Sequence, residues 1–112
     1  MAVTPLTGLA EFTEVTTRDR AAVVCFCATW AALCRSITPV FERLAESPEF
    51  ADTVGFYRVD IDEQRDIVRE TGTRPVPVFM VFRKGIKLDE SVAPDPEALR
   101  ALVENASKSG SS

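Results

Sequence analysis

Residues 22 to 34 read A-V-V-C-F-C-A-T-W-A-A-L-C, and this is the most informative stretch of the chain. Its first seven residues are mostly apolar and include β-branched side chains, a pattern typical of a strand buried on both faces. Helix-forming residues take over after Trp30, so the stretch predicts a strand that leads directly into a helix. In α/β proteins, ligands bind at the carboxyl end of such a central strand, because backbone N–H groups and the helix dipole point there. We therefore look for a functional site at this corner.

The remainder of the chain alternates between helix and strand patterns. Helices are expected over residues 9–18, 31–45 and 63–71 and from Pro96 onward, and strands over residues 22–28, 54–60, 78–82 and 87–92. Pro39 falls inside the second helix, and Asp95 is placed to cap the last one. The alternation predicts an α/β fold in which a central mixed sheet of four to five strands is flanked by helices on both faces. We expect one domain over residues 1–106 and a disordered polar tail over residues 107–112.

Composition narrows the possible functions. The chain has 112 residues and a net charge of -4, which disfavours nonspecific binding to nucleic acid or to anionic membranes. It contains neither a long apolar run nor a signal-like N-terminus, so we expect a cytoplasmic protein that does not enter the membrane. Because the sequence contains no histidine, Cys/His zinc sites and histidine acid–base catalysis are excluded. The three cysteines are an odd number, which argues against a disulfide framework.

Eight anchors along the chain resemble the thioredoxin family in order and spacing. They are Val23-Val24-x-Phe26, Ala28-x-Trp30, Cys34, Pro39, Val40-Phe41-x-x-Leu44-Ala45, Val59-Asp60-x-Asp62-Glu63, Val76-Pro77 and Phe82-x-x-Gly85. The resemblance covers nearly the whole chain and implies the thioredoxin fold. It also implies a cis peptide bond between Val76 and Pro77, facing the active site.

The site itself departs from the family pattern. Thioredoxins carry Trp-Cys-Gly-Pro-Cys where this chain reads Trp30-Ala31-Ala32-Leu33-Cys34. By this resemblance, Ala31 stands at the position of the attacking cysteine, and only the resolving cysteine, Cys34, remains. The resemblance also implies a buried acid where this chain has Cys25, so Arg58, its basic neighbour, is expected to lack that partner. Disulfide reduction needs an exposed thiolate with a second thiol behind it, so ordinary reductase activity is not expected.

Three interpretations of the cysteines Cys25, Cys27 and Cys34 stay open. Cys25 and Cys27 lie two positions apart on one strand, so their side chains point to the same sheet face, within reach of Cys34. A separation of about 6.6 to 7 Å between their Cα atoms makes a disulfide within this pair unfavourable. The trio can be three small buried hydrophobic groups, or Cys34 can pair with Cys25 or Cys27 on oxidation. Alternatively, the thiolates can bind a metal ion or an iron–sulfur cluster, with a fourth ligand from a small molecule or a second subunit.

The function expected from these observations is thioredoxin-like binding of a protein or peptide without normal disulfide reduction. The resemblance implies a binding groove in which Trp30 stacks on the peptide, although Trp30 could simply cap the end of the sheet. A rebuilt thiol site is the alternative function, and the protein is expected to be a monomer or a weak homodimer with no bound cofactor. The candidate site residues are Trp30, Ala31, Val76, Pro77, Val92 and Ala93 for binding, and Cys34 at the resolving position.

Overall fold

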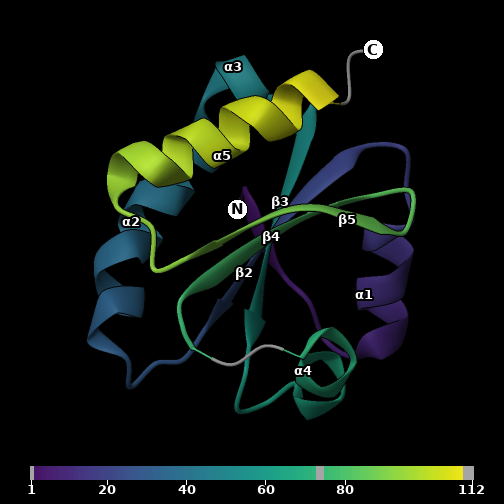
Figure 1. Cartoon of the computed structure of the whole chain (residues 1–112), viewed down its shortest axis with the longest axis vertical. Coiled ribbons are helices and arrows are strands. Elements are labelled where there is room, and N and C mark those ends of the chain that lie inside the picture. The colour runs from purple at the N-terminus through teal and green to yellow at the C-terminus, as the bar shows by residue number, and fades with distance from the viewer. Residues whose placement is uncertain (1, 73–74, 110–112) are drawn as a thin grey trace.

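A five-stranded mixed sheet forms the centre of the protein (Figure 1). The computed structural model describes residues 2–72 and 75–109. The strands lie in the order β1-β3-β2-β4-β5, and their bounds are β1 Val3–Pro5, β2 Ala21–Cys27, β3 Val54–Asp60, β4 Val78–Arg83 and β5 Ile86–Val92. β3 is parallel to both β1 and β2, whereas β4 is antiparallel to β2 and β5 is antiparallel to β4. The predicted α/β fold with a mixed sheet is confirmed.

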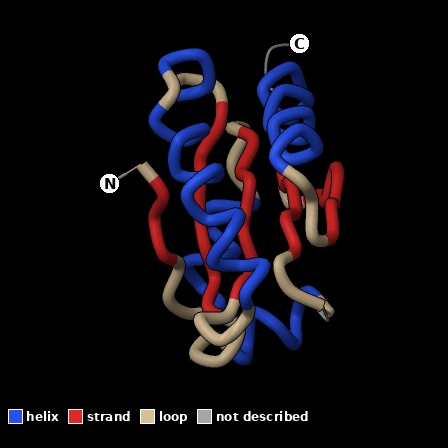
Figure 2. The backbone as a smooth tube through the Cα atoms, turned by 90° about the vertical axis from the view of Figure 1, so that its left-hand side faces the viewer, coloured by secondary structure: helices blue, strands red, loops and turns tan. Residues whose placement is uncertain are grey.

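Five helices cover the two faces of this sheet. α2 (Ala32–Glu46), the short α3 (Pro48–Ala51) and α5 (Pro96–Ser109) contribute to the core on one face, and α1 (Leu9–Thr16) and α4 (Arg65–Thr71) contribute to the core on the other. Figure 2 shows β1 at the left of the view, next to the N-terminus, and α5 at the upper right, leading to the C-terminus. Helices therefore flank both faces, as predicted.

Alternation along β2 divides the core into two layers. Val23 and Cys25 belong to the layer under α2 and α5, and Val24 and Phe26 to the layer under α1 and α4. All residues of β2 except Cys27 are buried, which explains why the sequence reads as one unbroken apolar run. The strand that leads to the candidate site is thus packed on both faces.

Two elements were not anticipated as such. β1 is a strand of three residues, too short to show an alternating pattern, and it adds the fifth strand beside β3. The one-turn helix α3, which follows α2 directly, was not predicted either. Pro48 lies in its first turn, and the Ser47 hydroxyl accepts a hydrogen bond from the Glu49 N–H.

The expectation of a disordered tail from residue 107 is wrong for residues 107–109. α5 continues through Ser109 because its last turn is tied to other elements. The Ser107 hydroxyl hydrogen-bonds the Thr53 hydroxyl at 2.6 Å, and the Arg83 guanidinium donates to the Ser109 carbonyl at 3.1 Å. Residues 110–112 of the predicted tail lie outside the described residues. Among the helices of the described chain, none has both the length and the apolar character required to cross a membrane.

Candidate functional site

The candidate site lies at one end of the sheet, where three chain segments meet. β2 ends at Cys27, and α2 begins at Ala32. Phe26 of β2 pairs with Val78, the first residue of β4, and Val78 pairs with Val92, the last residue of β5. The loop after β2, the segment before β4 and the segment after β5 therefore emerge at the same end, in the lower left of Figure 1.

The segment before β4 is held against the segment after β5. The Val76-Pro77 peptide bond is cis, in agreement with the expectation from the resemblance. The Ala93 N–H donates to the Pro77 carbonyl at 2.8 Å. Ala93 has a φ of 46°, in the left-handed region that non-glycine residues rarely adopt. The structure thus brings together the predicted residues Val76, Pro77, Val92 and Ala93.

Trp30 lies on the neighbouring loop and faces solvent. Its side chain is 66% exposed, and its indole N–H donates to an Asp62 carboxylate oxygen at 2.9 Å. Leu33 and Val92, at 60% and 49%, are also among the exposed large apolar residues of the described chain. This end of the sheet therefore presents unusual apolar area, with the Trp30 ring oriented by one hydrogen bond. The bond between Trp30 and Asp62 joins residues 32 positions apart, so it depends on a fold contact that the sequence pattern does not reveal.

Ala31 and Cys34 occupy the two ends of the first helical turn. Ala31 is the N-cap residue of α2 and makes no side-chain capping bond. Cys34 is buried, and its sulfur accepts a hydrogen bond from the Ala28 N–H at 3.4 Å. Burial raises the pKa of Cys34 to about 11, and the Ala28 N–H opposes this rise only in part. The remaining cysteine of the motif is therefore protonated at neutral pH.

The three cysteines form a contiguous group of free thiols. Cys25 and Cys27 share the sheet face beneath α2, as predicted, and their sulfur atoms lie 3.1 Å apart in a hydrogen bond. This bond to Cys25, together with burial, strongly raises the pKa of Cys27, and the Cys27 and Cys34 thiols interact as well. Within residues 2–72 and 75–109, no group of three or more His, Cys, Asp or Glu side chains is arranged to hold a metal ion. The structure therefore offers no support for the metal or cluster interpretation.

A cavity of about 560 Å³ opens beside the thiols. Cys27 and Cys34 contribute to its wall, together with residues of the β1–α1 connection and the carboxyl end of β3. Arg35 and Arg58 supply two cations to the lining. The sequence pattern does not reveal this cavity, because the cavity depends on β1, which brings Pro5 and Leu6 beside β3.

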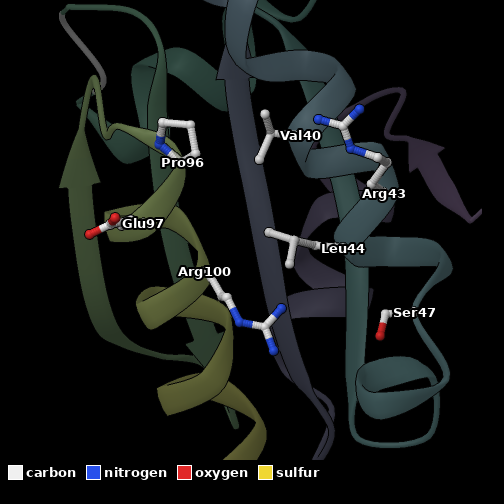
Figure 3. A pocket seen from close by; sticks show the side chains of 7 residues that line it. All are labelled: Val40, Arg43, Leu44, Ser47, Pro96, Glu97 and Arg100. Atoms are coloured by element: carbon white, nitrogen blue, oxygen red, sulfur yellow. The ribbon is translucent and has the colours of Figure 1, made fainter.

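A second hollow lies between α2 and α5, and Figure 3 shows the side chains that line it. Val40 and Leu44 point into it from α2, and the Arg100 guanidinium lies near Leu44 in the same view. Arg100 already pairs with Glu49 and Glu104 and lies over the Phe50 ring. This hollow is therefore best explained as part of the packing of α5 on α2 and α3, and it contains none of the predicted site residues.

Comparison with known proteins agrees with this geometry. The family model described as Thioredoxin matches residues 3–105. A thioredoxin of Malassezia sympodialis is 44% identical over 93 residues, which cover 83% of this chain and 88% of the relative. The thioredoxin Asp f 29 of Aspergillus fumigatus is 38% identical over 102 residues, which cover 90% of this chain and 92% of the relative. The crystal structure of Malassezia sympodialis thioredoxin (Mala s 13) is similar, with a TM-score of 0.90 at 41% identity over 94% of this chain and 93% of that one. The chain, with its five-stranded sheet and cis-proline beside the β2–α2 corner, belongs to the thioredoxin family.

Proposed function

We propose that this protein binds an extended protein or peptide segment at the sheet end described above and does not reduce disulfides by dithiol exchange. One observation supports the proposal above all: the exposed aromatic side chain of Trp30 is followed directly by Ala31, which has no thiol. Three unpaired cysteines suit a reducing compartment, so a cytoplasmic location forms part of the proposal.

The loss of dithiol chemistry follows from the thiols that remain. Exchange begins with attack by an exposed thiolate, and a second thiol then releases the mixed disulfide. Ala31 cannot attack, and Cys34 is buried with a pKa of about 11, so only about one molecule in ten thousand carries its thiolate at pH 7. A buried thiol of this kind is a poor replacement for the missing nucleophile.

Peptide binding follows from what remains exposed. A peptide laid across Trp30 would cover a large rigid aromatic surface, the kind of residue that dominates the energetics of protein interfaces. Val92 adds apolar area on the far side of the Pro77 segment. We name this surface, formed by Trp30, Ala31, Val76, Pro77, Val92 and Ala93, the sheet-end surface.

The binding test uses reduced and carboxymethylated insulin B chain as an extended peptide without free thiols. Titration of isotope-labelled protein is expected to shift the amide signals of the sheet-end surface, and Trp30→Ala is expected to weaken binding about tenfold. Ile86→Ala is the matched control, because Ile86 is an equally exposed apolar residue (62%) at the opposite end of β5. Equal losses of peptide affinity in the two variants, or signal shifts confined to other surfaces, would rule out the sheet-end surface as the binding site.

A second candidate function is a rebuilt thiol site, and the contiguous Cys25, Cys27 and Cys34 thiols favour it. With a hydroperoxide as oxidant, the Cys34 sulfur would take one oxygen from the peroxide and become a sulfenic acid. The O–O bond of the peroxide would break, and the remainder of the oxidant would be released as an alcohol. Attack by the Cys27 thiol would then form a Cys27–Cys34 disulfide and release water, so that two thiols supply the two electrons.

Mass spectrometry after peroxide treatment tests this second function. A loss of two hydrogens that maps to Cys27 and Cys34, and that dithiothreitol reverses, would support it. Cys34→Ser is expected to abolish the product, whereas Cys25→Ser is expected to retain it. Persistence of three free thiols after treatment would eliminate the rebuilt site.

A further inference from the structure

The cavity beside the thiols combines apolar walls with charged side chains of both signs, Arg35 and Arg58 alongside Asp60 and Glu63. Its volume of about 560 Å³ lies within the range of small-molecule sites, roughly 300–1,000 Å³. Pro5, Leu6 and Pro39 supply apolar wall, and the Cys27 and Cys34 sulfurs add a soft, uncharged surface. Such a lining suits a ligand that is mostly apolar.

Arg58 is the cation in this lining that lacks a partner. It pairs in register with Cys25 across the parallel β2–β3 ladder, so the two side chains lie on the same face of the sheet. Within residues 2–72 and 75–109, the Arg58 side chain forms no hydrogen bond or ion pair that meets the usual distance limits. Its neighbour on β2 is a thiol and supplies no carboxylate.

Three other charged side chains, those of Arg35, Asp60 and Glu63, line the cavity with Arg58. The Arg35 guanidinium donates to the Thr29 carbonyl at 3.0 Å, and its other N–H groups stay available. Asp60 Oδ1 accepts the N–H groups of Asp62 and Glu63, so part of its charge is already balanced. Glu63 also lines the cavity, and both Glu63 and Arg58 are exposed to solvent. Of the two cations in the lining, Arg58 is the one whose guanidinium has no acceptor within the described residues, so it is available to a ligand.

We propose that this cavity binds a small organic carboxylate with a short apolar body. The carboxylate accepts hydrogen bonds from the Arg58 guanidinium, which presents paired N–H donors suited to its two oxygens. The apolar body lies along Pro5, Leu6 and Pro39 and covers the two sulfurs. The site is separate from the sheet-end surface, because none of the six residues that define that surface lines the cavity.

The test compares three probes with the same chain length, octanoate, n-octylamine and 1-octanol, each below the concentration at which it forms micelles or a second phase. Heteronuclear NMR titration is expected to show octanoate shifting the amide signals around Cys27, Cys34 and Arg58, with tighter binding than either other probe. Tighter or equal binding of n-octylamine would overturn the proposal, as would the absence of shifts at these residues.

Charge-matched variants identify the recognising group. Arg58→Gln is expected to weaken octanoate binding about three- to tenfold, the range for one solvent-exposed charge-assisted contact. Arg69→Gln is the control, because Arg69 is an exposed arginine on α4 that does not line the cavity. Equal weakening by both variants would show a general charge effect and contradict a specific site.

Alkylation supplies a second readout. Octanoate that occupies the cavity is expected to slow the reaction of Cys27 and Cys34 with a small neutral alkylating reagent, and n-octylamine is expected to have a smaller effect. Unchanged alkylation rates in saturating octanoate would place the carboxylate elsewhere on the protein.

Discussion

Ala31 is the residue at which this chain departs most sharply from the family pattern. It caps α2 without a side-chain hydrogen bond, and it places a methyl group where the resemblance implies a thiol. The helix N-terminus stabilises negative charge in its first turn, which is why a thiolate at this position would be favoured. Cys34 lies three residues further along and is buried, so it does not receive the same exposure to solvent or substrate.

The pH dependence of Cys34 reactivity follows from its burial. Because the pKa of Cys34 is raised to about 11, the thiolate fraction rises about tenfold for each pH unit between pH 7 and 10. The alkylation rate of Cys34, followed by peptide mapping after timed quenching, is expected to rise in the same way over this whole range. The cysteine of an unstructured peptide, whose thiol has a pKa of about 8.5, serves as the control, and its alkylation rate is expected to level off at a lower pH. A Cys34 rate that levels off near pH 8.5 would show that the thiol is not desolvated.

At the scale of the elements, α5 illustrates how a short sequence signal sets a helix boundary. Asp95 was predicted as its N-cap, and this is confirmed: Asp95 Oδ1 accepts the Ala98 N–H at 2.8 Å, and the Asp95 carbonyl accepts the Leu99 N–H. Pro96 follows at the first helical position, where the missing N–H costs nothing. The start of α5 is thus encoded by two adjacent residues.

Removing this cap is expected to destabilise the protein. Asp95→Ala leaves one N–H of the first turn without its partner, so the free energy of unfolding should fall by about 1 kcal/mol. Asp95→Asn retains an oxygen that can cap and is expected to lose little. Urea denaturation of the three proteins measures the difference. A full loss in Asp95→Asn would mean that the carboxylate charge, and not the capping bond, stabilises α5.

Sequence patterns predicted every helix and strand of the described residues except β1 and α3. β2, β3, β4, α2 and α5 were all placed within a few residues of their observed bounds. The misses have physical causes: β1 and α3 are too short to show a period, and the end of α5 depends on bonds from Ser107 and Ser109 to distant residues. At the site, resemblance placed Val76 and Pro77, whereas the cavity and the Trp30–Asp62 bond arise only after folding.

For the whole molecule, one core layer joins the sheet to α2, α3 and α5. Phe41 lies at its centre, with ring centroids 5.6 Å from Phe56 and 5.1 Å from Phe79 in edge-on arrangements. This layer fixes α2 against the sheet and thereby fixes the position of Cys34 and the β2–α2 corner. Stability and site geometry therefore depend on the same packing.

Two aromatic truncations are expected to separate stability from binding. Phe41→Ala removes a buried ring and should lower the free energy of unfolding by about 3–5 kcal/mol. Trp30→Ala removes a mostly exposed ring and should change it by less than about 0.5 kcal/mol. Urea denaturation measures both changes in the free energy of unfolding, provided that the dependence of this free energy on urea concentration has the same slope in all proteins. If Trp30→Ala lost as much stability as Phe41→Ala, Trp30 would have a structural role at the end of the sheet, and this result would argue against its role in binding.

Whether this protein catalyses disulfide exchange is tested by the reduction of insulin by dithiothreitol, followed by turbidity, with and without the protein. Because Ala31 supplies no nucleophile and Cys34 is buried, the unmodified protein is expected to leave the rate at that of dithiothreitol alone. Ala31→Cys, which places a thiol three residues before Cys34, is expected to accelerate the reaction and shows that the assay responds to this fold. Acceleration by the unmodified protein would contradict the account and would mean that its existing cysteines carry out disulfide exchange.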